Sequence, residues 1–233
     1  MARQNKIPQI FSEKLFRKTM KTYLEESKNK SLYSRFSRMR NVVIFYICYY
    51  QGFRPKEAFC IEVSHLIFEQ KEIYIPAQNN KQRNQDMFPM SDFIISLIKE
   101  FMIVREEFLS GKTSKWLFPS TRNPESPVYR GTLIRGFTRA IESQELKQVS
   151  YVDAQGKRRL NLSIYSLRHS FGTNAMMKMK DIKQVAKVLR HYDVKCRSTY
   201  IYVHTDAQSS RRELLNNVVG KKNLNTKEIL GLV

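Results

Sequence analysis

Two arginines stand in short motifs whose neighbours suit chemistry on a phosphate group. Arg54 follows a glycine turn in Gly52-Phe-Arg-Pro-Lys-Glu57, and Arg168 lies in Tyr165-Ser-Leu-Arg-His169. A guanidinium pairs with phosphate through two parallel donors and stays charged at any working pH, so both arginines fit the role of holding a phosphodiester. In a chain this basic, either arginine alone could be an ordinary surface residue, and it is the surrounding motif that favours the phosphate role.

Cleaving a phosphodiester without a metal requires a nucleophile, fixed cations for the non-bridging oxygens and an acid for the leaving oxygen. The four histidines show no metal-ligand spacing and no carboxylate cluster is suited to Mg²⁺, so we expect no metal site and no cofactor. The segment Ser110-Gly-Lys-Thr113 resembles the end of a P-loop, but Glu106 occupies the position of the first glycine, so a P-loop is not predicted.

The charge balance points to a polyanionic partner. The chain has 233 residues, and its 41 Lys and Arg against 21 Asp and Glu give a net charge of +20. The cations are spread along the whole chain, which favours a folded surface that follows nucleic acid over a basic tail. The longest apolar run, Val42 to Tyr50, is too short to cross a bilayer, and the N-terminus lacks a secretion signal. Three scattered cysteines without a CxxC pair predict neither a disulfide framework nor a zinc site, so we expect a cytoplasmic protein with no membrane partner.

These residues must be positioned by a mainly helical fold. Capping residues and apolar spacing predict helices over Ser12–Glu26, Asn41–Gln51, Ser91–Leu109, Gly131–Ile141, Ser166–Met179, Asp181–Arg190 and Ser210–Val219, and a short one starting at Pro55. Three short segments between polar turns, Ser64–Phe68, Glu72–Pro76 and Asp86–Met90, predict a three-stranded antiparallel sheet. The turn Asp153-Ala-Gln-Gly156 marks a hairpin or an excursion. The expected fold class is α+β, mainly α-helical.

Five motifs in a fixed order carry a resemblance to a known family. After the two arginine motifs and Lys81 between them come Leu189-Arg-His191 and Ser198-Thr-Tyr-Ile-Tyr-Val-His204. In this order the pattern resembles the catalytic domain of tyrosine recombinases, the phage integrases and Xer-type resolvases, over about Lys14 to His204. The resemblance implies the fold of DNA breaking-rejoining enzymes. It also implies strand breakage and rejoining for recombination or integration, through a 3′-phosphotyrosine and without metal or ATP.

The resemblance assigns a role to each site residue. Arg54 and Arg168 would hold the scissile phosphate, and Lys81, in the turn of the second hairpin, would protonate the 5′ leaving oxygen, with Lys71 and Arg83 as competitors. His191 would donate a hydrogen bond to the phosphate. Arg190 replaces the glycine usual at its position, and we expect it to add a DNA contact.

The position usually held by the histidine of the His-x-x-Arg motif is Tyr165 in this chain. A tyrosine hydroxyl can donate to a phosphate oxygen, but it cannot take up a proton near neutral pH, so a general-base role there is not expected. His169, one residue after Arg168, is expected to pack or to bond to backbone.

The nucleophile implied by the resemblance is Tyr202, because Thr199-x-x-Tyr202-x-His204 matches the closing motif. Tyr200 has the more typical distance from His191 and is the alternative. The positive charge around the phosphate would favour the phenolate, whose unperturbed pKa is about 10.

We expect residues 1–233 to form a single catalytic domain with a core at about 12–204, without the N-terminal helical domain usual in the family. Residues 205–233 are apolar enough to dock on a neighbouring protomer, or on the same chain when monomeric. The expected partners are double-stranded DNA and further copies of the chain, up to a tetramer. Two alternatives stay open at this point: a type IB-like topoisomerase and a catalytically degenerate DNA-binding protein.

Overall fold

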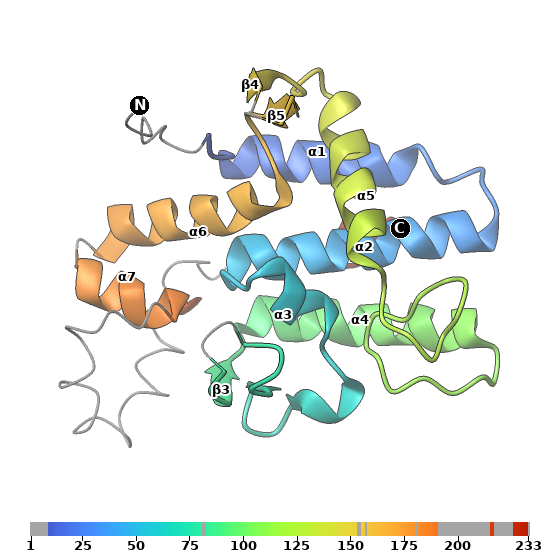
Figure 1. Ribbon diagram of the computed structural model, residues 1–233. Helices are drawn as coiled ribbons and strands as arrows, with labels where there is room; N and C mark the ends of the chain where they lie inside the picture. Colours follow the sequence, from blue (N-terminus) through green and yellow to red (C-terminus); the bar gives the residue numbers. More distant parts are fainter. Residues whose placement is uncertain are drawn as a thin grey trace.

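The computed structural model describes residues 9–80, 83–152, 155–156, 158–179, 181–190, 215–216 and 226–232. The helices are α1 (Glu13–Glu25), α2 (Leu32–Tyr50), α3 (Pro55–Phe59), η1 (Val63–His65), α4 (Asp92–Leu109), α5 (Arg130–Glu142), α6 (Ile164–Met179), α7 (Ile182–Leu189) and α9 (Thr226–Ile229). The strands are β1 (Leu66–Ile67), β2 (Glu72–Ile75), β3 (Asp86–Pro89), β4 (Val149–Val152) and β5 (Arg158–Leu160). The predicted class, mainly helical with a small sheet, is confirmed (Figure 1).

Helix α2 forms the centre of the core. Its residues from Val42 to Tyr50 are all buried, and it packs against α1, α3, α4, α5 and α6. Figure 1 shows α2 lying between α1 and α4. Because nearly every side of its second half is apolar, this helix is stable only when it is surrounded by other elements. The two helices next to the predicted site residues, α3 and α6, therefore both pack against α2.

The predicted start of this helix, Asn41, was wrong, because α2 begins nine residues earlier at Leu32. Ser31 caps the helix by accepting a hydrogen bond from the Ser34 amide. The first half looks polar in the sequence, yet Arg38 and Arg40 are almost fully buried. Arg38 bonds to Glu26 Oε2 at 2.8 Å, and Arg40 Nη1 donates to the carbonyl of Pro119 at 2.7 Å. Partners distant in sequence therefore allow charged residues to lie on a buried face.

The three-stranded sheet is confirmed, with the order β1-β2-β3 and antiparallel pairing throughout. Ile73 pairs with Leu66 on one side and with Phe88 on the other. Ile73, Ile75 and Phe88 are buried while Tyr74 is only partly covered, which is the alternation expected when one face of a sheet packs on a core. The paired strands β2 and β3 therefore fix both ends of the segment that joins them.

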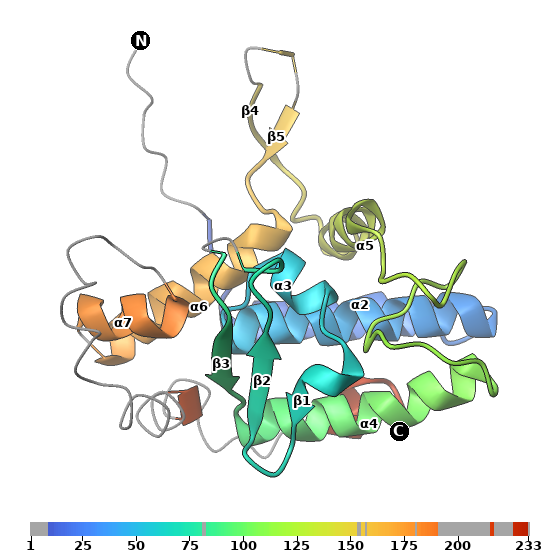
Figure 2. The same cartoon turned by 60° about the horizontal axis from the view of Figure 1, so that its bottom comes forward.

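The excursion predicted around Asp153 to Gly156 is a hairpin. Strands β4 and β5 pair antiparallel, and every residue of β4 is exposed. Figure 2 shows this hairpin extending away from the helices, just before the chain enters α6. Helix α6 starts at Ile164, two residues before the predicted start.

The remaining predicted helices are present, and the C-terminal region is described only in part. Ser12, Ser91 and Asp181 cap α1, α4 and α7 with their side chains. Of the predicted helix Ser210–Val219, only residues 215 and 216 are described, and both are helical. In the described ranges, no helix combines the length and the apolar character needed to cross a bilayer.

Candidate active site

A cavity of about 490 Å³ brings together residues from three separate parts of the chain. It is formed by the start of α3, the turn after β2 and the first two turns of α6. Its lining residues are Arg54, Lys56, Asn79, Asn80, Tyr165, Arg168 and His169. Both arginines selected from the sequence therefore face one cavity.

Gly52 allows the chain to place Arg54 at this cavity. Its φ of +66° lies in the left-handed region, and a Cβ added there would lie 2.4 Å from a ring carbon of Phe171 on α6. Only glycine fits a positive φ combined with such a close approach. The turn therefore packs directly on α6 and delivers Arg54 to the N-cap of α3, beside the helix that carries Arg168.

The two arginines are held by backbone carbonyls as well as by a carboxylate. Arg168 Nη1 donates to the Gly52 carbonyl at 2.7 Å, and its Nη2 donates to the Leu189 carbonyl. Arg54 Nη2 lies 3.5 Å from the carbonyl oxygen of Arg190. Leu189 and Arg190 are at the C-terminal end of α7, where carbonyls lack helical partners and carry partial negative charge. The end of α7 therefore orients both guanidiniums.

Glu57 lies at the centre of this arrangement, and its side chain is fully enclosed. It accepts hydrogen bonds from the Arg54 amide at 2.8 Å and from Arg54 Nη1 at 2.7 Å, and Arg168 Nη1 is 4.0 Å away. Burial alone would raise the pKa of Glu57, but the charges of Arg190 and Arg54 and the hydrogen bonds from Arg54 lower it on balance. Glu57 is thus an ionised anchor for the surrounding arginines.

Arg190 does not reach outward, so the expected DNA contact from this residue was wrong. Its side chain is 1% exposed, and Nη2 donates to Glu57 Oε2 at 2.5 Å. Its guanidinium carbon lies 4.6 Å from the ring centre of Phe53 and 4.7 Å from that of Phe88. The side chain turns inward because an enclosed carboxylate and two aromatic faces compensate the charge there.

Tyr165 and His169 occupy successive turns of α6 and line the same cavity. They are four residues apart, so they share one face of the helix. Both are exposed, Tyr165 by 43%. The expectation that His169 packs or bonds to backbone was therefore wrong. Partial burial and the adjacent charge of Arg168 lower the pKa of His169, which favours the neutral imidazole.

Three predicted site residues, Lys81, His191 and Tyr202, lie outside the described residues, as does Tyr200. The residues directly before Lys81 and His191 are described. Asn80, before Lys81, lines the cavity, and Arg190, before His191, donates a hydrogen bond to Glu57. The competitor Lys71 lies at the opposite end of β2, where its Nζ bonds to Asp92 at 2.8 Å.

The sequence did not indicate Asn79 and Asn80 as cavity residues. The side-chain nitrogen of Asn79 donates to the Cys60 carbonyl at 3.3 Å, and that of Asn80 donates to the Asn84 carbonyl at 2.8 Å. The run of amides before Lys81 was the available signal, because such side chains bond readily to a turn's own backbone.

The chemistry of the cavity is that of an anion site. Arg54, Arg168 and Arg190 lie around a single carboxylate, which leaves excess positive charge next to the opening. No group of three or more His, Cys, Asp or Glu in the described part of the chain is arranged to hold a metal ion. A diester in the cavity would meet guanidinium, hydroxyl, imidazole and amide groups, all of which can donate hydrogen bonds to its oxygens.

Known proteins share this arrangement of elements. The chain is 26% identical over 170 residues to the tyrosine recombinase XerC of Psychromonas ingrahamii, covering 73% of this chain and 50% of that protein. It is 23% identical over 228 residues to the tyrosine recombinase XerD of Rickettsia bellii, covering 94% of this chain and 67% of that one. The chain thus spans half the length of the XerC relative.

The fold is similar to that of the XerH site-specific recombinase bound to its difH substrate, with a TM-score of 0.59 and 22% identity. That similarity covers 85% of this chain and 51% of the XerH chain. The phage integrase family model matches residues 15–209, which is most of the sequence. The chain belongs to the phage integrase family.

Proposed function

We propose that this protein breaks and rejoins DNA strands at specific sites by a tyrosine recombinase mechanism. The observation that carries the proposal is the convergence of Arg54 and Arg168 on one cavity, through Glu57 and the end of α7. Two fixed guanidiniums around one diester stabilise the charge that builds on its non-bridging oxygens during attack. Family membership and the relatives named as tyrosine recombinases support the same reaction.

In this mechanism the phenolate oxygen of Tyr202 attacks phosphorus while the bond from phosphorus to the 5′ oxygen breaks. Lys81 gives its proton to that 5′ oxygen, which leaves as a hydroxyl. The product is a 3′-phosphotyrosine, and attack by a 5′ hydroxyl reverses the step and frees the tyrosine, so no ATP is consumed. The cavity position of Asn80 supports Lys81 as the acid, because the turn that carries it borders the cavity.

His191 and Tyr165 complete the proposed site. His191 directly follows Arg190, whose carbonyl accepts from Arg54, and this supports His191 as the donor to a non-bridging oxygen. Tyr165 lines the cavity and would donate its hydroxyl proton to the phosphate. We propose Tyr165 as a hydrogen-bond donor and not as a general base.

We propose double-stranded DNA as the substrate and the cytoplasm as the place of action. The net charge of +20 supports a polyanionic partner, and XerH, whose fold this chain shares, is bound to a difH substrate. Both the DNA substrate and the cytoplasmic location are part of this proposal.

A covalent trap tests the mechanism and the nucleophile. In a duplex with a nick just beyond the cut site, cleavage frees a short fragment that carries the new 5′ hydroxyl. This fragment diffuses away, so the strand cannot be rejoined and the enzyme stays linked to the DNA. We expect a covalent protein–DNA band on a denaturing gel, formed in the presence of EDTA. Tyr202→Phe should abolish the band, because phenylalanine has no oxygen to attack phosphorus, and Tyr200→Phe should retain it.

The outcomes of this experiment separate the assignments. A band that persists in Tyr202→Phe and disappears in Tyr200→Phe moves the nucleophile to Tyr200. Absence of a band from the unchanged protein, in a preparation that binds the duplex, would overturn the proposed reaction.

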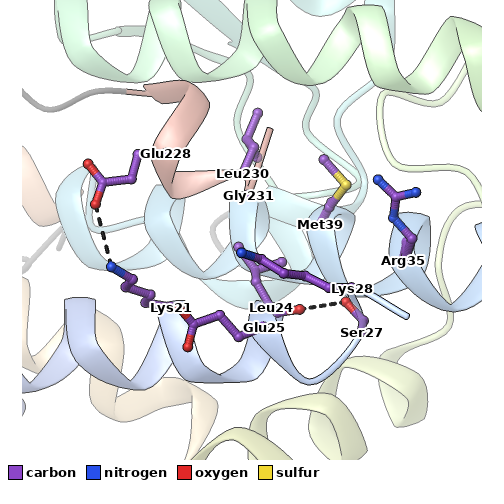
Figure 3. Close-up of a pocket in the computed structure, with 10 residues that line it drawn as sticks. All are labelled: Lys21, Leu24, Glu25, Ser27, Lys28, Arg35, Met39, Glu228, Leu230 and Gly231. Carbon is purple, nitrogen blue, oxygen red and sulfur yellow. Dashed lines mark hydrogen bonds and ion pairs between the residues drawn. The ribbon is translucent and has the colours of Figure 1, made fainter. Parts of the chain in front are cut away.

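We further propose that the C-terminal segment mediates self-association on DNA. Helix α9 packs against α4 of its own chain, and Leu230, just after it, is 1% exposed. Figure 3 shows Leu230 and Gly231 beside Leu24 and Met39 in a pocket of about 600 Å³ between α1 and α2, with Glu228 bonded to Lys21 at 3.7 Å. On a second copy, Leu24 and Met39 would offer the same apolar contact and Lys21 the same ion pair to this segment.

Removal of the residues after Asn217 is expected to raise the dissociation constant of the dimer by at least about fivefold, the effect of losing roughly 1 kcal/mol of interface energy. Analytical ultracentrifugation with the target duplex present measures this constant. Leu230→Asp should have a similar effect because it places a charge where an enclosed leucine lies, whereas Leu232→Asp, at a position that is 41% exposed, is the matched control. Unchanged association after truncation would reject the docking role.

A further inference from the structure

Arg190 connects three elements that border the candidate active site. It follows the last residue of α7, and its Nη2 bonds to Glu57 on α3 at 2.5 Å. Its guanidinium packs against the rings of Phe53 and Phe88, the latter on β3. The negative charge of Asp86, at the start of β3, stabilises the positive charge of the Arg190 guanidinium. One buried side chain thus contacts the arginine turn, the helix before His191 and the hairpin strand that follows Lys81.

This placement carries a clear free-energy cost. Arg190 has a φ of 54°, in the left-handed region, which is strained for any residue other than glycine. Its Nε and Nη1 atoms are buried without a hydrogen-bond partner among the described residues. Glycine would adopt the same backbone without strain and without burying a charge. A side chain retained at such a cost indicates a function that depends on it.

The backbone at Arg190 explains what the side chain fixes. The carbonyl of Arg190 is the acceptor near Arg54 Nη2, and the preceding carbonyl, of Leu189, accepts from Arg168. A shift of this short segment would therefore move both guanidiniums at once. The next residue is His191, so the same shift would displace the start of the segment that leads to Tyr202.

We propose that Arg190 is a positioning residue of the DNA cleavage reaction: by joining the C-terminal end of α7 to Glu57, it fixes Arg54 and Arg168 in the geometry that the transition state requires. It contacts no substrate itself, since its side chain is enclosed. This inference rests on the proposed function, because it assigns a residue to the same reaction.

The test compares Arg190→Met, Arg190→Gly and Arg190→Lys in single-turnover cleavage of the nicked duplex at saturating protein. Arg190→Met and Arg190→Gly should cleave slower by on the order of 10²-fold, the effect of a displacement of about 1 Å at a reacting group. Affinity for the duplex should stay within about threefold, because an enclosed side chain makes no phosphate contact. Arg190→Lys should recover part of the rate, because it keeps a charge beside Glu57 but lacks the planar group that packs against the two rings.

A second substrate distinguishes positioning from folding. In a scissile methylphosphonate, a methyl group replaces one non-bridging oxygen, so less negative charge develops for Arg54 and Arg168 to stabilise. If Arg190 acts through those arginines, the defect of Arg190→Met should shrink by about tenfold or more on this substrate. An equal defect on both substrates would mean that Arg190 supports only the fold.

Arg40→Met is the matched control, because Arg40 is also 1% exposed and bonds to a backbone carbonyl, that of Pro119 at 2.7 Å, away from the cavity. It should lose stability but keep the cleavage rate per folded molecule. Cleavage by Arg190→Met at the unchanged rate overturns the inference. If Arg190→Met does not fold, Arg190→Lys replaces it in the comparison of the phosphodiester with the methylphosphonate. Absence of a covalent band from the unchanged protein is a failure of the proposed function instead.

Discussion

Replacement of Arg168 by lysine is expected to slow DNA cleavage by about 10²- to 10³-fold, the effect of removing one preorganised donor from a developing oxyanion. Arg168 lines the cavity and is held by the carbonyls of Gly52 and Leu189. Lysine keeps the positive charge but cannot donate to two backbone carbonyls and a phosphate oxygen with one planar group. Single-turnover cleavage of the nicked duplex, together with duplex affinity, measures the effect.

The matched control for this change is Arg105→Lys. Arg105 is also buried and donates to two carbonyls, those of Trp116 at 3.0 Å and Ser114 at 2.5 Å, but it does not line the cavity. It should fold less stably and cleave at an unchanged rate once corrected for the folded fraction. Equal loss of rate in both variants would show that Arg168 acts through stability alone.

Replacement of Glu57 by glutamine is expected to cost about 3 to 5 kcal/mol of unfolding free energy, the usual effect of breaking a buried ion pair from one side. Glu57 is the shared acceptor for Arg54 and Arg190, and without its charge these buried guanidiniums repel one another. Urea unfolding followed by circular dichroism measures the change. The matched control is Glu62→Gln, because Glu62 pairs with Lys115 at 2.9 Å where the lysine is largely exposed. That change should cost less than about 1 kcal/mol.

The same carboxylate gives stability a defined pH dependence. The folded pKa of Glu57 is lowered from the ordinary value of 4.5, so the unfolded chain binds the proton more readily. The stabilisation is therefore complete above about pH 4.5 and is lost as the pH falls through the lower folded pKa. Glu57→Gln should flatten this acid limb of the stability profile. A profile identical to that of the unchanged protein would contradict the anchoring role.

Local sequence patterns predicted most of the helices and strands. Ser12, Ser91 and Asp181 were readable as helix caps, and the strands could be located from short β-branched and aromatic runs between polar turns. Caps and turns act over three or four residues, so the chain itself contains the information. The same reasoning placed Gly52 at the end of a helix, where its positive φ is found.

The charged residues of α2 and of the site could not be placed in this way. The predicted helix began at Asn41, after Arg38 and Arg40, and Arg190 was expected to contact DNA. All three arginines are buried. His169 was expected to pack, yet it is exposed at the cavity. Burial of a cation depends on its acceptor, and here the acceptors are Glu26, the Pro119 carbonyl and Glu57.

The order of the motifs along the chain predicted the residue types of the proposed reaction and selected Arg54 and Arg168, which line one cavity. Only the tertiary structure decided that Glu57 serves as a common anchor and that the end of α7 holds both guanidiniums. The physical reason is distance along the chain. Helix periodicity and caps are local, whereas a buried charge is stable only where folding brings an opposite charge or a free carbonyl to it.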